Sequence, residues 1–267
     1  MQHIMIAHDL SQQADTALLR AHHLAEQHSA KLTVLHVLED HLPKPVLEQN
    51  KAAARAMLEQ RLAEFGIAAD LVLVIGRPAQ SIVEQQKARS ADLLVMGDHH
   101  QASPHYFSGT TLERVLQRST SPVLLAINSE PARYQRALVS MDFSRCACNA
   151  LHYTHAVLES TAQIHAVHVL EQAEVHERDL AEREWQQELF EQLIVDECKK
   201  MPSEGAAVTH ALYQGELYSC MDTILQEQRP QLFALGKHGR GVLADALLGS
   251  MAQYFLENPP CDVLLVK

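Results

Sequence analysis

Short apolar segments alternate along this chain with longer segments in which apolar residues recur at helical spacing. The apolar segments, such as 93–96 (LLVM) and 263–266 (VLLV), are continuous and do not alternate with polar residues. Continuous apolar strands between amphipathic helices are typical of a parallel sheet that helices cover on both faces. With right-handed crossovers, the pattern predicts a doubly wound α/β sandwich.

The same pattern occurs twice in the chain. Residues 3–39 and 136–171 each contain an apolar strand, an Asp-x-Ser sequence, a helix pattern and a second strand that ends in His-Val-Leu-Glu. Asp9 in the first copy matches Asp142 in the second. A repeat of this length predicts two domains of the same fold in tandem.

The later strands of each copy repeat as well. The strand that ends at Gly97 matches the strand that ends at Gly236, and the closing segment 121–127 matches 261–267. Each copy is therefore predicted to form an open, parallel, five-stranded sheet, and a polar segment with a proline separates the two copies. The predicted domains are residues 1–130 and 134–267.

Glycines gather after the fourth strand of the second copy. Ligands of doubly wound sheets bind beyond the carboxyl ends of the strands, so Asp142 and Gly236 fall on the predicted binding rim. Segment 235–251 (LGKHGRGVLADALLGSM) holds four of the ten glycines together with Lys237 and Arg240. Glycines let a ligand approach the backbone, and a Gly-Ser pair that opens a helix offers amide groups and a hydroxyl to an anion such as phosphate.

A glycine loop without a ligand is the alternative interpretation of this segment. Neither of two familiar phosphate motifs fits it. The Walker A motif requires a different spacing, and the dinucleotide fingerprint requires glycines after the first strand instead of the fourth. The position of the segment between a buried strand and a helix favours phosphate binding.

These residues resemble a known family. Gly236-x-x-Gly239, followed after nine residues by Gly249-Ser250, is similar to the nucleotide-binding signature of universal stress proteins. The strand-end aspartates, the His-Val-Leu-Glu strand ends, GRPAQSI at 76–82 and the closing SPVLLA support the likeness, which covers both copies. The resemblance implies a tandem two-domain member with the adenine nucleotide alpha-hydrolase-like fold.

The resemblance also implies a role for each matching residue. Asp142 and Met141 would meet the adenine edge, and Val169 would line the base pocket. The ribose and phosphates would lie along the glycine segment, at Leu235, Gly236, His238, Gly239, Gly249 and Ser250. Asp142 has a second interpretation as a helix cap, because Asp-x-Ser before a helix is also capping chemistry, and both roles can hold together.

The first copy departs from the signature. His100 stands where the second glycine belongs, the loop before Gly109-Thr110 is one residue shorter, and it contains Pro104. The first copy is therefore predicted to lack a triphosphate site, although Asp9 and Val37 keep part of a base pocket. Imidazoles near a carboxylate also bind transition metals. A plain polar rim is one interpretation of these histidines. A metal site is the other, and its weak candidates are His8, His99, His100 and His105.

The sequence favours a protein that binds ATP, ADP or AMP in its second domain as a regulatory ligand, with Mg²⁺ accompanying the triphosphate. Slow ATP hydrolysis is an alternative, but no residue is clearly placed to activate water. A second alternative is a nucleotide-free protein that docks a basic partner through the acidic helix pattern of 171–197. An adenylating enzyme is disfavoured because HDLS and MDFS replace its Ser-Gly-Gly-x-Asp-Ser loop. A flavin-type electron carrier is a further rival, which the absorbance of the purified protein would decide.

Charge and composition narrow the class of partner. The net charge is −11, which disfavours binding to nucleic acid. No signal-peptide pattern and no apolar run of membrane-spanning length are evident, so the expected location is cytoplasmic. The five cysteines do not predict a disulfide framework in a reducing compartment. Cys146 and Cys148 leave open a metal or redox role.

The two closing strands carry the last expectation. Segments 123–127 and 263–266 are apolar and lie at the edges of their predicted sheets, and exposed apolar edges favour strand pairing. Members of the resembled family commonly pair through this strand. The chain is therefore predicted to form a pseudo-two-fold dimer within itself, with a further homodimer of whole chains left open.

Overall fold

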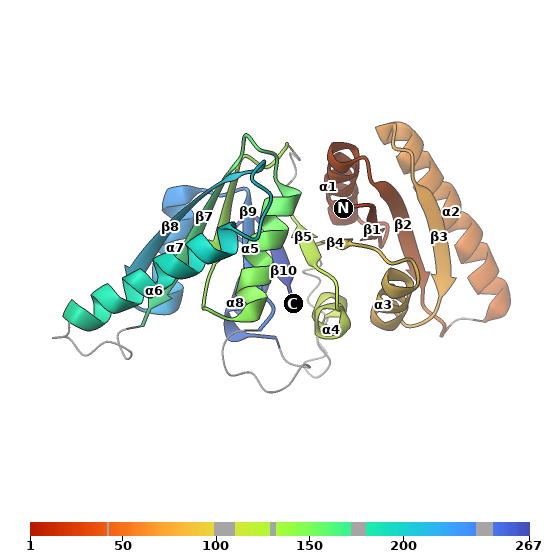
Figure 1. Ribbon diagram of the computed structural model, residues 1–267. Helices are drawn as coiled ribbons and strands as arrows, with labels where there is room; N and C mark the ends of the chain where they lie inside the picture. The colour runs from red at the N-terminus through yellow and green to blue at the C-terminus, as the bar shows by residue number, and fades with distance from the viewer. Residues whose placement is uncertain (42, 99–109, 129–131, 172–179, 239–247) are drawn as a thin grey trace. The chain divides into compact units, whose positions relative to one another are not determined.

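The computed structural model describes residues 1–267 except 42, 99–109, 129–131, 172–179 and 239–247 (Figure 1). The chain divides into two compact units, Met1–Arg133 and Tyr134–Lys267. Each unit has its own parallel sheet and its own helices.

In the first unit, the described strands form a parallel sheet in the order β3-β2-β1-β4-β5. Its strands are β1 (His3–Ala7), β2 (Lys31–Leu38), β3 (Asp70–Ile75), β4 (Leu93–Gly97) and β5 (Val123–Ala126). Its helices are α1 (Gln12–His28), α2 (Lys44–Phe65), α3 (Pro78–Ala88) and α4 (Thr111–Arg118).

The second unit repeats this arrangement, with a parallel sheet in the order β10-β9-β6-β7-β8. Its strands are β6 (Arg136–Ser140), β7 (Gln163–Leu170), β8 (Ala207–Gln214), β9 (Leu232–Gly236) and β10 (Asp262–Val266). Its helices are α5 (Arg145–Val157), α6 (Leu180–Cys198), α7 (Leu217–Gln228) and α8 (Ser250–Glu257). The predicted doubly wound, five-stranded parallel sheet is thereby confirmed for each copy.

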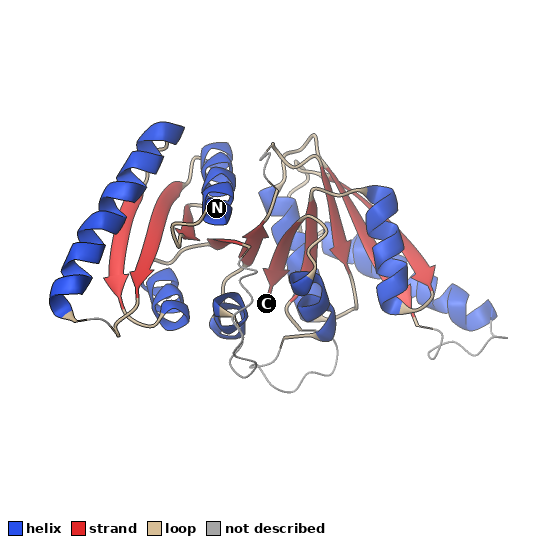
Figure 2. Cartoon of the chain, turned by 180° about the vertical axis from the view of Figure 1, so that it is seen from behind, coloured by secondary structure: helices blue, strands red, loops and turns tan. Residues whose placement is uncertain are grey.

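Helices cover both faces of each sheet (Figures 1 and 2). The inner strands β1 and β4 of the first unit are buried along their whole length, because helices lie above and below them. In each unit the strand order reverses beside the first strand, between β1 and β4 and between β6 and β9. This reversal places the switch point, and with it the expected ligand crevice, at the carboxyl ends of those strands.

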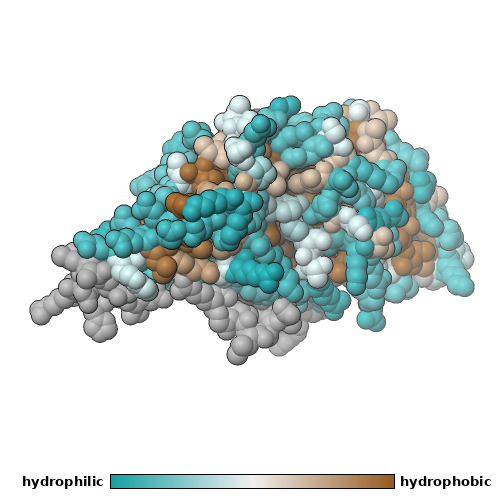
Figure 3. Space-filling model, viewed as in Figure 1, coloured by the Kyte–Doolittle hydropathy of each residue, from teal (hydrophilic) through white to brown (hydrophobic). Residues whose placement is uncertain are grey.

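Charged and polar residues cover much of the face seen in Figure 3, and hydrophobic residues lie there in separate patches. Large apolar side chains that stand in solvent include Met57 on α2 and Trp185 on α6, which are 44% and 54% exposed. Among the helices of the described chain, none has both the length and the apolar character that crossing a bilayer requires.

Candidate functional site

Each unit carries a tight turn directly after its first strand. In the second unit, the turn runs from Met141 to Ser144, and the Oδ1 atom of Asp142 accepts a hydrogen bond of 2.9 Å from the Ser144 amide. The Ser144 hydroxyl then caps α5 by accepting from the Ala147 amide at 3.2 Å. The helix cap is therefore Ser144, and Asp142 supports it by holding the Ser144 amide.

The first unit builds the same turn from the matching residues Asp9 and Ser11. The Oδ1 atom of Asp9 accepts from the amide and the hydroxyl of Ser11, at 3.0 and 2.6 Å. Leu10 and Phe143, which follow the two aspartates, have φ angles of 74° and 60°. A left-handed backbone is uncommon for residues with such side chains, so the surrounding contacts must hold both turns in place.

The predicted base-pocket residues lie beside this turn in the second unit. Met141 and Val169 are 1% and 6% exposed, whereas Asp142 is half-buried. Met141 follows β6, and Val169 lies near the end of the neighbouring strand β7. Adjacent parallel strands end at the same edge of the sheet, so these residues share the rim of the second unit.

The glycine segment returns to the same turn. The hydroxyl of Ser144 donates to the carbonyl of His238 at 3.4 Å, and the Gly249 amide donates to the carbonyl of Lys237 at 3.0 Å. Lys237 and His238 are both buried. The structure therefore brings the start of the glycine segment, the start of α8 and the Asp142 turn into one neighbourhood. Gly239 lies outside the described residues.

Helix α8 begins at this site without a side-chain cap. Gly249 is its N-cap residue, and no side chain bonds the first-turn amides among the described residues. Ser250 is exposed at the first position of the helix. Helix starts leave amide groups unpaired and carry a partial positive charge, so this end of α8 suits an anion.

The matching helix of the first unit is closed by its own side chains. Thr110 accepts from the Glu113 amide at 3.2 Å, and the Glu113 carboxylate accepts from the Thr110 amide at 2.9 Å. This capping box places a carboxylate at the start of α4, where an anionic ligand would otherwise lie. Glu113 is absent from the residues singled out in the sequence, although the Thr-x-x-Glu spacing is the signal for a capping box.

In the sequence, Ser250 and Gln253 of the second unit match Thr110 and Glu113, and they lie one position further into their helix because Gly249 is its N-cap residue. Gln253 is neutral, and its amide nitrogen donates along the helix to Glu257 at 3.4 Å. The two units therefore differ at the helix start by one negative charge, in addition to the loop differences noted above.

Gly97 and Gly236 end the fourth strand of each unit and pack closely against a helix. A Cβ atom on Gly236 would lie 2.8 Å from the Cys146 Cβ atom and 2.9 Å from the Ala147 amide nitrogen. On Gly97 it would lie 2.6 Å from the Gln13 carbonyl oxygen. These glycines let α1 and α5 approach the sheet, which is a packing role besides the predicted contact of Gly236 with a ligand.

Replacing either strand-end glycine by alanine is expected to lower the free energy of unfolding by about 1–3 kcal/mol, because the new methyl group overpacks helix backbone. Gly215→Ala is the matched control, since its Cβ atom would meet Cys220 at an ordinary 3.7 Å. Urea denaturation of the three variants measures the difference. A Gly236→Ala protein as stable as Gly215→Ala would contradict the packing role.

His8 is the one metal candidate within the described residues. Its Nδ1 atom accepts from the Leu10 amide at 2.9 Å, and its Nε2 atom pairs with Asp15 at 3.0 Å. Asp15 is also paired with Arg61. Both ring nitrogens are therefore engaged, and a metal would have to displace one of these bonds. His99, His100 and His105 lie outside the described residues, and no metal-binding group of three ligands occurs among the residues that the structure describes.

The cysteines are free thiols. Burial, and then the charge of Glu197, raise the pKa of Cys148. Burial raises the pKa of Cys261 to about 12. A thiol with a raised pKa is protonated at neutral pH and is a poor nucleophile and a poor metal ligand.

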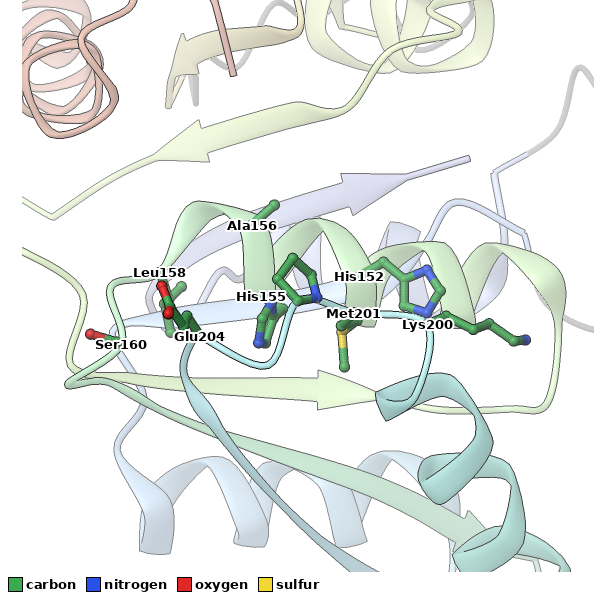
Figure 4. Close-up of a pocket in the computed structure, with 10 residues that line it drawn as sticks. His152, His155, Ala156, Leu158, Ser160, Lys200, Met201 and Glu204 are labelled. Carbon is green, nitrogen blue, oxygen red and sulfur yellow. The ribbon is translucent and has the colours of Figure 1, made fainter.

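A separate hollow of about 490 Å³ lies in the second unit, at the end of the strands opposite to the Asp142 turn (Figure 4). His152 and His155 of α5 line it together with Lys200 and Gly205, which precede β8. His152 and Lys200 both pair with Glu197, at 2.8 and 2.5 Å. Burial, and then the neighbouring His152, lower the pKa of His155. The hollow lies near the amino-terminal ends of β7 and β8, away from the strand-end turns.

Comparison with known proteins gives the family. The model of the universal stress protein family matches residues 1–126 and again residues 133–267. The chain belongs to the universal stress protein family. It contains two such domains in tandem, as the sequence predicted.

Relatives of this universal stress protein include both single and tandem forms. A universal stress protein of Thermus aquaticus, from the QAH/OAS sulfhydrylase 3' region, is 32% identical over 131 residues, which are 46% of this chain and 96% of the relative. A universal stress protein structure from Archaeoglobus fulgidus DSM 4304 covers 99% of this chain and 98% of its own, with a TM-score of 0.71 and 21% identity. That likeness concerns the fold. A universal stress protein solved in complex with cAMP is 25% identical, covers 48% of this chain and 98% of its own, and has a TM-score of 0.38.

Proposed function

We propose that this universal stress protein binds one adenine nucleotide, ATP or a related form, in its second unit and that the nucleotide acts as a regulatory ligand. The observation that carries the proposal is the difference between the two helix starts. The first turn of α8 has no side-chain cap, whereas Glu113 closes the first turn of α4. A phosphate group fits the helix start that carries no carboxylate.

The remaining parts of the site agree with this placement. The hydrogen bonds of Ser144 and Gly249 join the Asp142 turn, the glycine segment and α8. We assign the adenine edge to Met141, Asp142 and Val169. The sugar and phosphates would follow Leu235, Gly236, His238, Gly239, Gly249 and Ser250. Mg²⁺ would accompany the triphosphate and neutralise part of its charge, and we assign it no protein ligand.

Titration calorimetry with ATP and Mg²⁺ tests the proposal, and the expected stoichiometry is one nucleotide per chain. Inorganic triphosphate separates phosphate binding from recognition of the base, and ATP is expected to bind more tightly because it also contacts the Met141 and Val169 pocket. Two equal sites would contradict the assigned difference between the units. Absence of binding would reject the proposed function.

A further inference from the structure

A histidine of the second strand faces the residue that follows the first strand in the second unit. The β6–β7 register pairs Ser140 with Val167, so Met141 lies opposite His168. The Nδ1 atom of His168 lies 2.7 Å from the Met141 carbonyl oxygen. A carbonyl oxygen only accepts, so Nδ1 carries the hydrogen and donates it.

This bond completes the attachment of Met141 to β7. The Met141 amide donates to the Val167 carbonyl at 2.8 Å, so both main-chain groups of Met141 are held by the neighbouring strand. The imidazole takes the place that a main-chain donor has in a continuing sheet. Because Met141 and His168 are both buried, loss of the donor would leave a buried carbonyl oxygen without this partner.

His168 also supports the middle of the turn. The Phe143 ring stands edge-on to the imidazole, with ring centroids 4.8 Å apart and planes at 88°. Phe143 is the residue with a φ angle of 60°, so the contact helps to hold a backbone conformation that its side chain disfavours. His168 therefore touches both residues that flank Asp142.

The first unit contains the same device without an open helix start beside it. Its register pairs Ala7 with Leu35, and the Nδ1 atom of His36 lies 2.7 Å from the His8 carbonyl oxygen. The two histidines thus make the same bond at the same place in two copies of one fold. Variants of His36 and His168 can therefore be compared to separate the contribution of this bond to stability from its contribution to binding.

We propose that His168 is a positioning residue for the nucleotide. It fixes the turn that presents Asp142, and the neighbouring residue Val169 lines the same pocket, so a displaced turn would separate the two sides of the base site. The inference rests on the proposed function but adds a residue that touches the turn and not the ligand. Small displacements of a binding group lower affinity because the contacts depend on distance and direction.

The test measures ATP affinity with Mg²⁺ in the full chain for three variants. His168→Leu removes the donor and is expected to weaken binding about fivefold to tenfold. His168→Asn places an amide N–H near the position of Nδ1 and is expected to restore affinity to within about twofold of the wild type. His36→Leu removes the matching bond of the first unit and is expected to leave affinity unchanged, while both leucine variants lower the melting temperature.

Three results would overturn the inference. These are an unchanged affinity in His168→Leu, a loss in His168→Asn as large as in His168→Leu, or an equal loss in His36→Leu. If His168→Leu does not fold, His168→Gln takes its place as the variant that removes the bond to Met141, because the glutamine amide extends one atom beyond the Nδ1 position. A wild-type chain that binds no ATP would reject the proposed function, and this inference would fall with it.

Discussion

Gln253→Glu is expected to weaken ATP binding about thirtyfold, which corresponds to about 2 kcal/mol at 25 °C. The substitution gives the second unit the sequence pattern of the first, since Ser250 and the new glutamate match Thr110 and Glu113 in the sequence, although they lie one position further into the helix because Gly249 is the N-cap residue of α8. A carboxylate in the first turn of α8 would repel the phosphates and would compete with them for the helix amides. The same change should leave stability equal or slightly higher, because negative charge near the start of a helix is favourable.

Calorimetry at low and at high salt measures this effect. Gln253→Lys is the control for a change of side chain at the same position, and it should bind ATP at least as tightly as the wild type. Glu113→Gln is the control for the other unit and should leave the affinity unchanged. The loss in Gln253→Glu should shrink as salt rises, since exposed charges are screened. A loss that is equal in the glutamate and lysine variants would show a steric cause and contradict the electrostatic argument.

The sequence predicts the repeated fold because its signals are local and strong. Continuous apolar strands, Asp-x-Ser helix starts and strand-end glycines each recur in both copies, and each corresponds to an element of the structure. The turn at Asp142 and the buried position of Val169 follow from the same strand pattern. These features depend on neighbours along the chain and on which end of a strand a residue occupies, and the strand pattern indicates both.

Other parts of the site depend on contacts that no local pattern contains. The sequence indicates a difference between the copies at His100 and the shorter loop, but the effect of Glu113 comes from its place at a helix start. Gly236 is predicted as a ligand contact, and the sequence gives no sign that a Cβ atom there would also meet the helix atoms of Cys146 and Ala147. In the sequence His168 is only part of a strand-end motif, because the bond to Met141 needs the register of two strands.

The segment that leads into the second unit shows the same limit. The sequence predicts a polar linker there, yet Tyr134 is 2% exposed and Asp262, the first residue of β10, is fully buried. The Tyr134 hydroxyl donates to the Asp262 carboxylate at 2.6 Å. The two residues are 128 positions apart, so spacing along the chain could not relate them. The contact joins the start of this unit to its last strand.

Tyr134→Phe is therefore expected to lower the free energy of unfolding of the second unit by about 2–3 kcal/mol, because a buried carboxylate loses a charge-assisted hydrogen bond and water cannot replace it. Tyr254→Phe is the matched control. The Tyr254 hydroxyl makes the same kind of bond, to Asp222 at 2.8 Å, but on the exposed surface, and its loss should leave stability nearly unchanged because water takes its place. Guanidinium denaturation followed by the single tryptophan, Trp185, reports on the second unit. Equal stability of the two variants would show that burial of the Tyr134–Asp262 bond does not contribute, and that this contact does not secure β10 to the start of the unit.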